Sequence, residues 1–247
     1  MAISKCVILC GGNGTRMKPF TDALPKELLP IIRYPVIDFI MSECKEGGIR
    51  QVCFVMNKKK DSLQLYIEQH FQDFDKTFVM QDNGYGTATA VLSAQKFIGN
   101  DDFCVVFPDE IAFGANKPLS ELLKKNEETN ACIIGCKKVS SKDTKKYGII
   151  ELNKDKTVKN IIEKPIKKVY SHLAMCGRFV FCNDFLPYLT SIPEHNGEKY
   201  LTDAINVYVK DKKCFSHVLN QKTFDCGNPV DFYKTNSFFA KKIFLLK

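Results

Sequence analysis

The sequence predicts an α/β fold with an open, mostly parallel central sheet and helices on both of its faces. In the first two-thirds of the chain, apolar runs of strand length alternate with segments whose apolar residues recur at helical spacing. The first apolar run stops at the glycine-rich stretch GGNGTR, as a strand does when it enters a tight turn. Later segments are mostly strand-like and are joined by lysine-rich turns. The alternation favours parallel strands connected by helices that pack against the sheet.

Each expected element rests on a local pattern. Residues 35–46 carry apolar side chains at helical spacing before Gly47 and Gly48, and residues 61–71 present one apolar helical face. A third helix is expected after the turn NGYGT, to about residue 97, and two more at about 200–209 and 231–241. The expected strands are residues 7–10, 51–56, 77–81, 103–107, 131–139, 147–152, 158–163 and 173–181.

Length and composition favour a single domain, residues 1–247, with a nucleotide-binding half at about 1–110 and a second-substrate half at about 111–247. Apolar content of 45% and charged content of 26% are typical of a globular protein with a buried core. No apolar run approaches the length of a membrane span, and the first residues lack the long apolar region of a signal peptide. We therefore expect a cytoplasmic protein without a membrane partner.

The net charge of +8, from 36 basic and 28 acidic residues, favours an anionic partner. The lysines lie in short scattered clusters without a dense basic arm, so we expect a phosphate-rich small substrate rather than nucleic acid. The eleven cysteines include no CxxC pair, and many lie inside apolar runs. They are expected to be buried, reduced thiols rather than zinc ligands or disulfides.

The stretch from residue 7 to residue 30, VILCGGNGTRMKPFTDALPKELLP, is the strongest local signal for function. Glycines after a strand let backbone N–H groups approach a phosphate, and a hydroxyl and two cations add further contacts. The P-loop string GxxxxGK[ST] does not occur, and the GxGxxG fingerprint fails because Met17 stands at its third glycine. A plain βα turn is the alternative for the loop alone. The residues expected to form this triphosphate site are Gly11, Gly12, Gly14, Thr15, Arg16 and Lys26.

Two further features follow expected strands, where ligands bind in sheets of this kind. Gln81 precedes small residues that include Gly86, and its amide could bind the edge of a base, although such turns are often only structural. Asp109 follows the apolar run 103–107 and could either hold Mg²⁺ or cap a helix. Asp225 has a similar setting in FDCGNPVDF. If the two carboxylates met in space, they would bind one Mg²⁺ ion.

Two later strand ends suggest a sugar-phosphate site. Tyr147 and Gly148 open one expected strand, and the run Glu163, Lys164, Pro165 closes another. A glutamate can accept hydrogen bonds from sugar hydroxyls while the neighbouring lysine reaches a phosphate. A solvated Glu–Lys pair is the alternative for these residues alone.

Together, these motifs resemble the bacterial glucose-1-phosphate uridylyltransferases, also called UDP-glucose pyrophosphorylases. GGNGTR, PKELLP, VVFPDE, YGIIE, EKP, LTDAI and FDCGNPVDFY occur in that family's order over about residues 7–233. GGxGTR and EKP mark the wider sugar-nucleotidyltransferase superfamily, whereas PKELLP, LTDAI and DCGN narrow the resemblance to this branch. The resemblance implies a Rossmann-like fold of the nucleotide-diphospho-sugar transferase type. It also implies an Mg²⁺-dependent reaction of UTP with glucose 1-phosphate that gives UDP-glucose and pyrophosphate, and we expect a homo-oligomer.

The resemblance assigns a role to each matching position. The sugar phosphate is already an anion, so no general base is required, and the cations would offset the repulsion between two polyanions. Arg16, Lys26 and Lys164 would be these cations, with the triphosphate on Gly11, Gly12, Gly14 and Thr15, the uracil at Gln81 and Gly86, the glucose at Gly148, Glu163 and Gly177, and Mg²⁺ on Asp109 and Asp225.

The chain departs from the family pattern in ways that bear on specificity. It lacks a longer segment between the helix ending near residue 71 and Gln81, and Gln81 lies nearer its glycines than in that pattern. It also has His172 where the family tends to have asparagine. The same chemistry with dTTP or another hexose 1-phosphate is therefore an alternative. A non-catalytic sugar-nucleotide-binding regulator is a second alternative, which the intact cations and acids disfavour. An NAD-dependent oxidoreductase is disfavoured by Met17.

Overall fold

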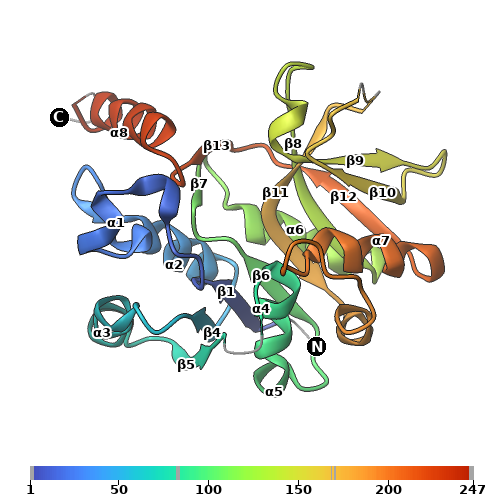
Figure 1. Cartoon of the computed structure of the whole chain (residues 1–247), viewed down its shortest axis with the longest axis horizontal. Helices are drawn as coiled ribbons and strands as arrows, with labels where there is room; N and C mark the ends of the chain where they lie inside the picture. Colours follow the sequence, from blue (N-terminus) through green and yellow to red (C-terminus); the bar gives the residue numbers. More distant parts are fainter. Residues whose placement is uncertain (1–2, 82–83, 168, 170, 245–247) are drawn as a thin grey trace.

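The computed structural model describes residues 3–81, 84–167, 169 and 171–244, and within them nine strands form one mixed sheet (Figure 1). Its order is β10-β9-β11-β6-β1-β4-β5, with β8 also beside β11 and β12 beside β8. Because β11 pairs with β6 and β8, strands of both predicted halves belong to one sheet. The strands are β1 (Lys5–Leu9), β4 (Gln51–Met56), β5 (Asp75–Met80), β6 (Phe103–Val106), β8 (Cys132–Lys138), β9 (Gly148–Leu152), β10 (Val158–Glu163), β11 (Leu173–Phe181) and β12 (Cys214–Val218).

The parallel part of the sheet consists of β6, β1, β4 and β5. In its centre, Cys6 of β1 lies opposite Val52 of β4 and Cys104 of β6. These central strands are buried on both faces, which explains why they stand out in the sequence as nearly continuous apolar runs. Successive side chains of a strand point to opposite faces, so Ile8 packs in one core cluster and Val7 in the other.

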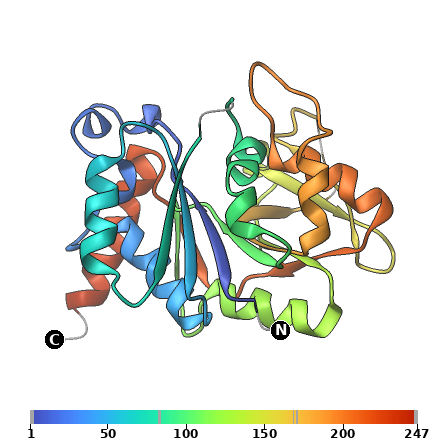
Figure 2. The same ribbon diagram turned by 90° about the horizontal axis from the view of Figure 1, so that it is seen from below.

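Helices cover both faces of the sheet (Figure 2). This arrangement confirms the predicted fold class. On the Ile8 side lie α2 (Val36–Glu46), α3 (Asp61–His70), α6 (Pro118–Thr129) and α8 (Pro229–Phe244). On the Val7 side lie α4 (Thr87–Ser93), α5 (Gln95–Ile98), α7 (Leu201–Asp211) and the 3₁₀ segment η4 (Asn183–Leu189). Within the described residues, no helix is both long and apolar enough to cross a membrane.

The structure differs from the expected elements in several places. The helix expected to run to about residue 97 is interrupted at Ala94, and Asn83 of the turn before it lies outside the described residues. Helix α6 and strand β12 were not expected. The short elements that the sequence also did not predict are η1 (Thr15–Met17), α1 (Phe20–Ala23), η2 (Lys26–Leu28), β2 (Pro30–Ile31), β3 (Tyr34–Pro35), β7 (Glu110–Phe113), η3 (Thr144–Lys146), η4 (Asn183–Leu189) and β13 (Lys222–Asp225).

A buried ion pair joins α2 to β11. The Nε and Nη2 atoms of Arg178 lie 2.8 and 2.9 Å from the two carboxylate oxygens of Glu43. Nη1 donates to the carbonyls of Phe107 and Gly177, and Nη2 also donates to that of Glu110. Both charged side chains are only 2% exposed. The pair therefore links a helix, a central strand and the turn that follows β6.

We expect Glu43→Gln to lower the free energy of unfolding by about 3–5 kcal/mol, because it leaves the Arg178 charge buried without its counter-ion. Urea denaturation measures this change. The matched control is Glu46→Gln on the same helix, whose partly exposed side chain lies 3.6 Å from Lys117. The control should change stability by no more than about 0.5 kcal/mol. Equal effects of the two substitutions would contradict the importance of the buried pair.

Candidate active site

Three sequence features meet at the carboxyl ends of β1, β5 and β6, as predicted. They line one cavity of about 450 Å³. The cavity contains seven of the predicted site residues: Gly11, Gly12, Thr15, Lys26, Gln81, Gly86 and Asp109. Its other lining residues are Leu9, Asn13, Tyr85, Thr87, Ala90, Phe107, Glu198 and Tyr200.

Asn57 holds the glycine-rich loop from the neighbouring strand. It directly follows β4, and its Nδ2 donates to the carbonyl of Gly11 at 2.8 Å and to Asn13 Oδ1 at 3.1 Å. Gly14 has a φ of 65°, a left-handed conformation that glycine adopts readily, and it starts the turn of η1. Thr21 Oγ1 donates to the Gly14 carbonyl at 2.8 Å. The loop is therefore fixed at both ends by side chains.

Lys26 lies between the loop and Asp109. Its Nζ is 2.7 Å from Asp109 Oδ2, and a Cβ atom placed on Gly12 would stand 3.7 Å from the same Nζ. Burial would lower the pKa of Lys26, but the carboxylates of Asp109 and Glu27 outweigh it and raise this pKa to about 12. Burial would raise the pKa of Asp109, but Lys26 and Arg16 hold it below its ordinary value. Both groups are therefore charged at neutral pH.

The side chain of Gln81 packs against the glycine-rich loop. A Cβ atom on Gly11 would stand only 2.5 Å from Gln81 Oε1, so a larger residue would displace this amide. Gln81 Nε2 donates to the carbonyls of Gly84 and Gly86 at 3.2 and 3.1 Å. These two bonds fix the amide with its oxygen toward the loop.

A distant segment closes this side of the cavity. Lys199 N–H donates to the Tyr85 carbonyl at 3.0 Å, which brings Glu198 and Tyr200 to the cavity wall. Gly86 has a φ of 106°, and a Cβ atom there would overlap the Lys199 carbonyl. Only glycine therefore fits where the two segments touch.

The carboxylates of Asp225 and Asp109 both lie beside Gly227. The sequence alone had left open whether these two residues are close in space. Strand β13 pairs antiparallel with β7, and Cys226 N–H donates to the Asp109 carbonyl at 2.7 Å. A Cβ atom on Gly227 would stand 3.1 Å from Asp225 Oδ1 and 3.2 Å from Asp109 Oδ2. The same atom would be 2.9 Å from Arg16 Nη2. Two carboxylates and a guanidinium therefore surround one point.

The predicted sugar-site residues lie on the neighbouring strands, outside the lining of this cavity. Gly148 of β9 and Glu163 of β10 are cross-strand partners. Gly177 of β11 lies against Phe107, and its carbonyl accepts the Phe107 N–H at 2.8 Å. Burial raises the pKa of Glu163, and Lys164 acts against this rise. The Lys164 side chain is 67% exposed, with its Nζ 3.9 Å from Glu163 Oε1.

Sequence reasoning missed several residues of the cavity. Asn57 and Asn13 were not singled out, although Asn57 follows an expected strand and so lies at the edge where ligands bind. Glu198 and Tyr200 were also missed. Tyr200 directly precedes the LTDAI motif, which was the one available signal.

A larger cavity of about 560 Å³ lies elsewhere, between α2 and the end of α3. It contains none of the predicted site residues. Its lining mixes apolar rings, such as Phe39 and Phe74, with the rim pair Lys45 and Asp73, whose charged atoms lie 2.7 Å apart. The smaller cavity is the better candidate, because the glycine-rich loop, the cation and the acid converge there.

A sequence model described as Nucleotidyl transferase matches residues 5–242. The chain belongs to the nucleotidyl transferase family. This nucleotidyl transferase is 32% identical to the UTP–glucose-1-phosphate uridylyltransferase of Mycoplasma genitalium, over 96% of the chain and 92% of the relative. It is also 32% identical to the enzyme of that name from Bacillus subtilis, over 96% and 91% of the two chains. The aligned stretch of 268 residues in the first comparison exceeds the 247 residues of this chain, so the relative has residues that this chain lacks.

Solved structures give the same family. The fold of this nucleotidyl transferase is similar to that of a UDP-glucose pyrophosphorylase complexed with UDP-glucose, with a TM-score of 0.89 and 27% identity. That match covers 97% of this chain and 99% of the other. A UTP-bound UGPase from Acinetobacter baumannii matches with a TM-score of 0.85 and 26% identity over 96% and 93% of the two chains.

We expect Asp225→Asn to raise the melting temperature at pH 8. Burial raises the pKa of Asp225, and the Asp109 charge adds to this rise. A carboxyl whose pKa is higher in the folded chain binds more protons there, so its ionised form destabilises the fold above that pKa. The stabilisation by Asp225→Asn should therefore shrink as the pH falls through the pKa of Asp225 in the folded chain. It should be absent below the ordinary carboxyl pKa of about 3.9.

The control for this prediction is Asp231→Asn. Hydrogen bonds from Lys234 and Asn228 lower the pKa of Asp231, so its ionised form stabilises the fold. Removing this charge should lower the melting temperature at pH 8. Thermal denaturation of both variants at pH 8 and at pH 4 tests the two signs. A lower melting temperature for Asp225→Asn at pH 8 would contradict the assignment.

Proposed function

We propose that this nucleotidyl transferase converts UTP and glucose 1-phosphate to UDP-glucose and pyrophosphate. The observation that carries the proposal is the single cavity in which the glycine-rich loop, Lys26, Gln81 and Asp109 converge. The names of the relatives at 32% identity support the choice of substrates. In this proposal, as the sequence predicted, the substrates are small phosphate compounds, the assembly is a homo-oligomer and the location is cytoplasmic.

In this proposal UTP binds along the cavity. Its triphosphate lies on the loop formed by Gly11, Gly12, Gly14 and Thr15. The fixed Oε1 atom of Gln81 is an acceptor that suits the N3–H of uracil, and Gly86 leaves room for the ring beside the backbone. Thymine presents the same N3–H, so dTTP belongs in the test of specificity.

Asp109 and Asp225 are suited to hold Mg²⁺. This ion prefers oxygen ligands and is commonly bound by one or two carboxylates together with substrate phosphates and water. Among the residues that the structure describes, no group of three or more His, Cys, Asp or Glu side chains is arranged to hold a metal ion. A pair of carboxylates beside the phosphate loop fits this manner of binding. When bound, Mg²⁺ would neutralise phosphate charge and help orient the α-phosphate.

In this proposal, cationic side chains of the chain offset the negative charge of the two substrates during the reaction. A phosphate oxygen of glucose 1-phosphate attacks the α-phosphorus of UTP, the bond to the β-phosphate oxygen breaks, and pyrophosphate leaves. The attacking oxygen is already anionic, so no residue has to remove a proton. Lys26 and Arg16 offset the charge of the triphosphate, and Lys164 offsets that of the sugar phosphate. Glu163, Gly148 and Gly177 position the glucose for in-line attack.

Pyrophosphate release tests this proposal. The chain is incubated with Mg²⁺ and glucose 1-phosphate together with UTP, dTTP, CTP, ATP or GTP in parallel. We expect release with UTP, at least about tenfold above the other nucleotides, and loss of release when EDTA removes the divalent ion. A preference for dTTP would mean that the chain catalyses the same reaction with a different nucleotide substrate. If the chain binds UTP but releases no pyrophosphate with any hexose 1-phosphate, it is a regulator and the proposal is wrong.

Lys164→Ala tests the sugar-phosphate cation. Because the side chain is exposed, its loss should leave the melting temperature nearly unchanged while turnover falls about 10²-fold to 10³-fold. Lys167→Ala removes the same charge from an exposed position three residues away and serves as the control. Unchanged kinetics of Lys164→Ala would refute its assigned role.

A further inference from the structure

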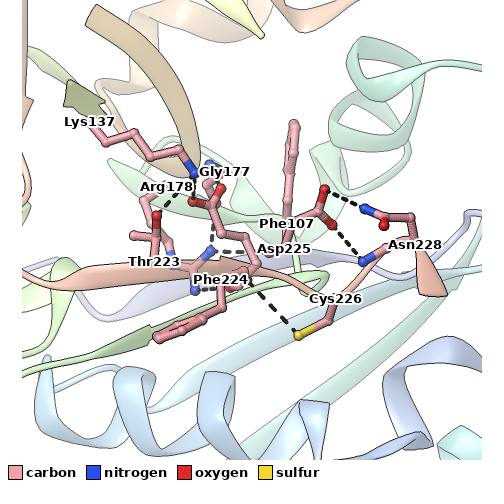
Figure 3. A network of polar contacts seen from close by, with 11 residues as sticks. Phe107, Lys137, Gly177, Arg178, Thr223, Phe224, Asp225, Cys226 and Asn228 are labelled. Atoms are coloured by element: carbon pink, nitrogen blue, oxygen red, sulfur yellow. Dashed lines mark hydrogen bonds and ion pairs between the residues drawn. The ribbon is translucent and has the colours of Figure 1, made fainter. Parts of the chain in front are cut away.

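A second network lies beside the Asp109–Asp225 pair, and its two charged members, Glu110 and Lys137, were not among the predicted site residues. Glu110 directly follows Asp109, and Lys137 lies on β8. Figure 3 shows Lys137 beside Thr223 and Gly177 in this network. Its members come from β7, β8, β11 and β13.

Lys137 is the centre of the network. Its Nζ donates to Glu110 Oε1 at 2.7 Å and to Thr223 Oγ1 at 3.0 Å. It also lies 4.8 Å from the centre of the Tyr147 ring, a cation–π distance. These contacts hold the ammonium on three sides.

Glu110 connects Lys137 to Gly177, one of the residues predicted to bind glucose. Its second oxygen, Oε2, accepts the N–H of Gly177 at 3.4 Å, while Oε1 binds Lys137. Glu110 and Lys137 are 16% and 19% exposed, so solvent screens the pair only weakly. Burial would lower the pKa of Lys137, but Glu110 outweighs it, and the pKa lies above its ordinary value. The Lys137 ammonium is therefore charged at neutral pH.

The same residues connect the two carboxylates to the strands expected to bind glucose. In the register of β7 with β13, Glu110 lies opposite Asp225, and Thr223 is two residues before Asp225. Asp109 is the residue before Glu110. Tyr147 directly precedes Gly148, the start of β9. A shift of Lys137 would therefore change the distance between the carboxylates and the strands expected to bind glucose.

We propose that Glu110 and Lys137 are positioning residues that set the sugar-phosphate site against the Asp109–Asp225 pair. This inference rests on the proposed function, because it assigns glucose 1-phosphate to the β9–β11 side. The pair acts through its neighbours: Glu110 holds the backbone of Gly177, and Lys137 holds Thr223 and Tyr147. The glycine-rich loop has no part in the network, so UTP binding should depend on it little.

Lys137→Met tests the inference by steady-state kinetics of the whole chain with UTP, glucose 1-phosphate and Mg²⁺. The kcat/KM for glucose 1-phosphate should fall about 10-fold to 100-fold, since a small displacement of reacting groups has effects of this order. The KM for UTP should remain within about twofold, because binding energy made on the loop is unaffected. Lys137→Arg, which can keep the ion pair, should recover most of the activity.

The matched control is Lys138→Met. Lys138 is the next residue of the same strand and is exposed, so its side chain points to the other face. The substitution Lys138→Met removes the same charge without a contact to the network. It should leave the KM for UTP and the KM for glucose 1-phosphate unchanged. Equal kinetics of Lys137→Met and Lys138→Met would overturn the inference, while an active wild type would leave the proposed function standing.

A double variant separates positioning from stability. Lys137→Met leaves Glu110 partly buried without its cation, whereas Glu110→Gln with Lys137→Met removes both charges and should fold even where the single variant does not. We expect the double variant to recover the melting temperature and still show the loss in kcat/KM for glucose 1-phosphate. Recovery of both would mean that the pair only stabilises the fold. A wild type without pyrophosphate release would instead overturn the proposed function and this inference with it.

Discussion

The buried ion pair between Arg178 and Glu43 is the interaction on which the arrangement of the candidate site depends. A charge in the interior is unfavourable by several kcal/mol unless it is paired and its hydrogen bonds are made. Here Glu43 supplies the paired carboxylate, and the carbonyls of Phe107, Gly177 and Glu110 accept the remaining N–H groups. The pair therefore connects α2, β11 and the turn after β6.

That turn carries Asp109. Arg178 binds the carbonyls of Phe107 and Glu110, which stand on either side of Asp109, so its backbone is fixed from both directions. The Asp109 carboxylate then meets Lys26, and its carbonyl accepts the N–H of Cys226. The turn that the buried pair holds is therefore also the place where the later segment with Asp225 joins the site.

Much of the acidic content near the sheet's carboxyl edge is paired with the chain's lysines. Lys26 pairs with Asp109, Lys137 with Glu110, and the buried Lys60 lies 2.5 Å from the Glu27 carboxylate beside Lys26. Alternating charges of this kind keep like charges apart. The Arg16 guanidinium lies at the same point as the Asp109 and Asp225 carboxylates and opposes the repulsion between them.

The sequence by itself determined the parallel strands and the three features at their carboxyl ends, because local apolar runs and glycine-rich turns report local burial and backbone geometry. Gly11, Gly12, Lys26, Gln81 and Asp109 could therefore be grouped at one edge of the sheet from the order of strands and turns along the chain. Only the tertiary structure decided the meeting of Asp109 with Asp225, the Glu43–Arg178 pair, and the wall formed by Glu198 and Tyr200. Strands β7 and β13 each carry only one buried residue, so neither stands out in the sequence as an apolar run. Contacts between residues far apart in the chain depend on how whole elements pack, and no local periodicity encodes that packing.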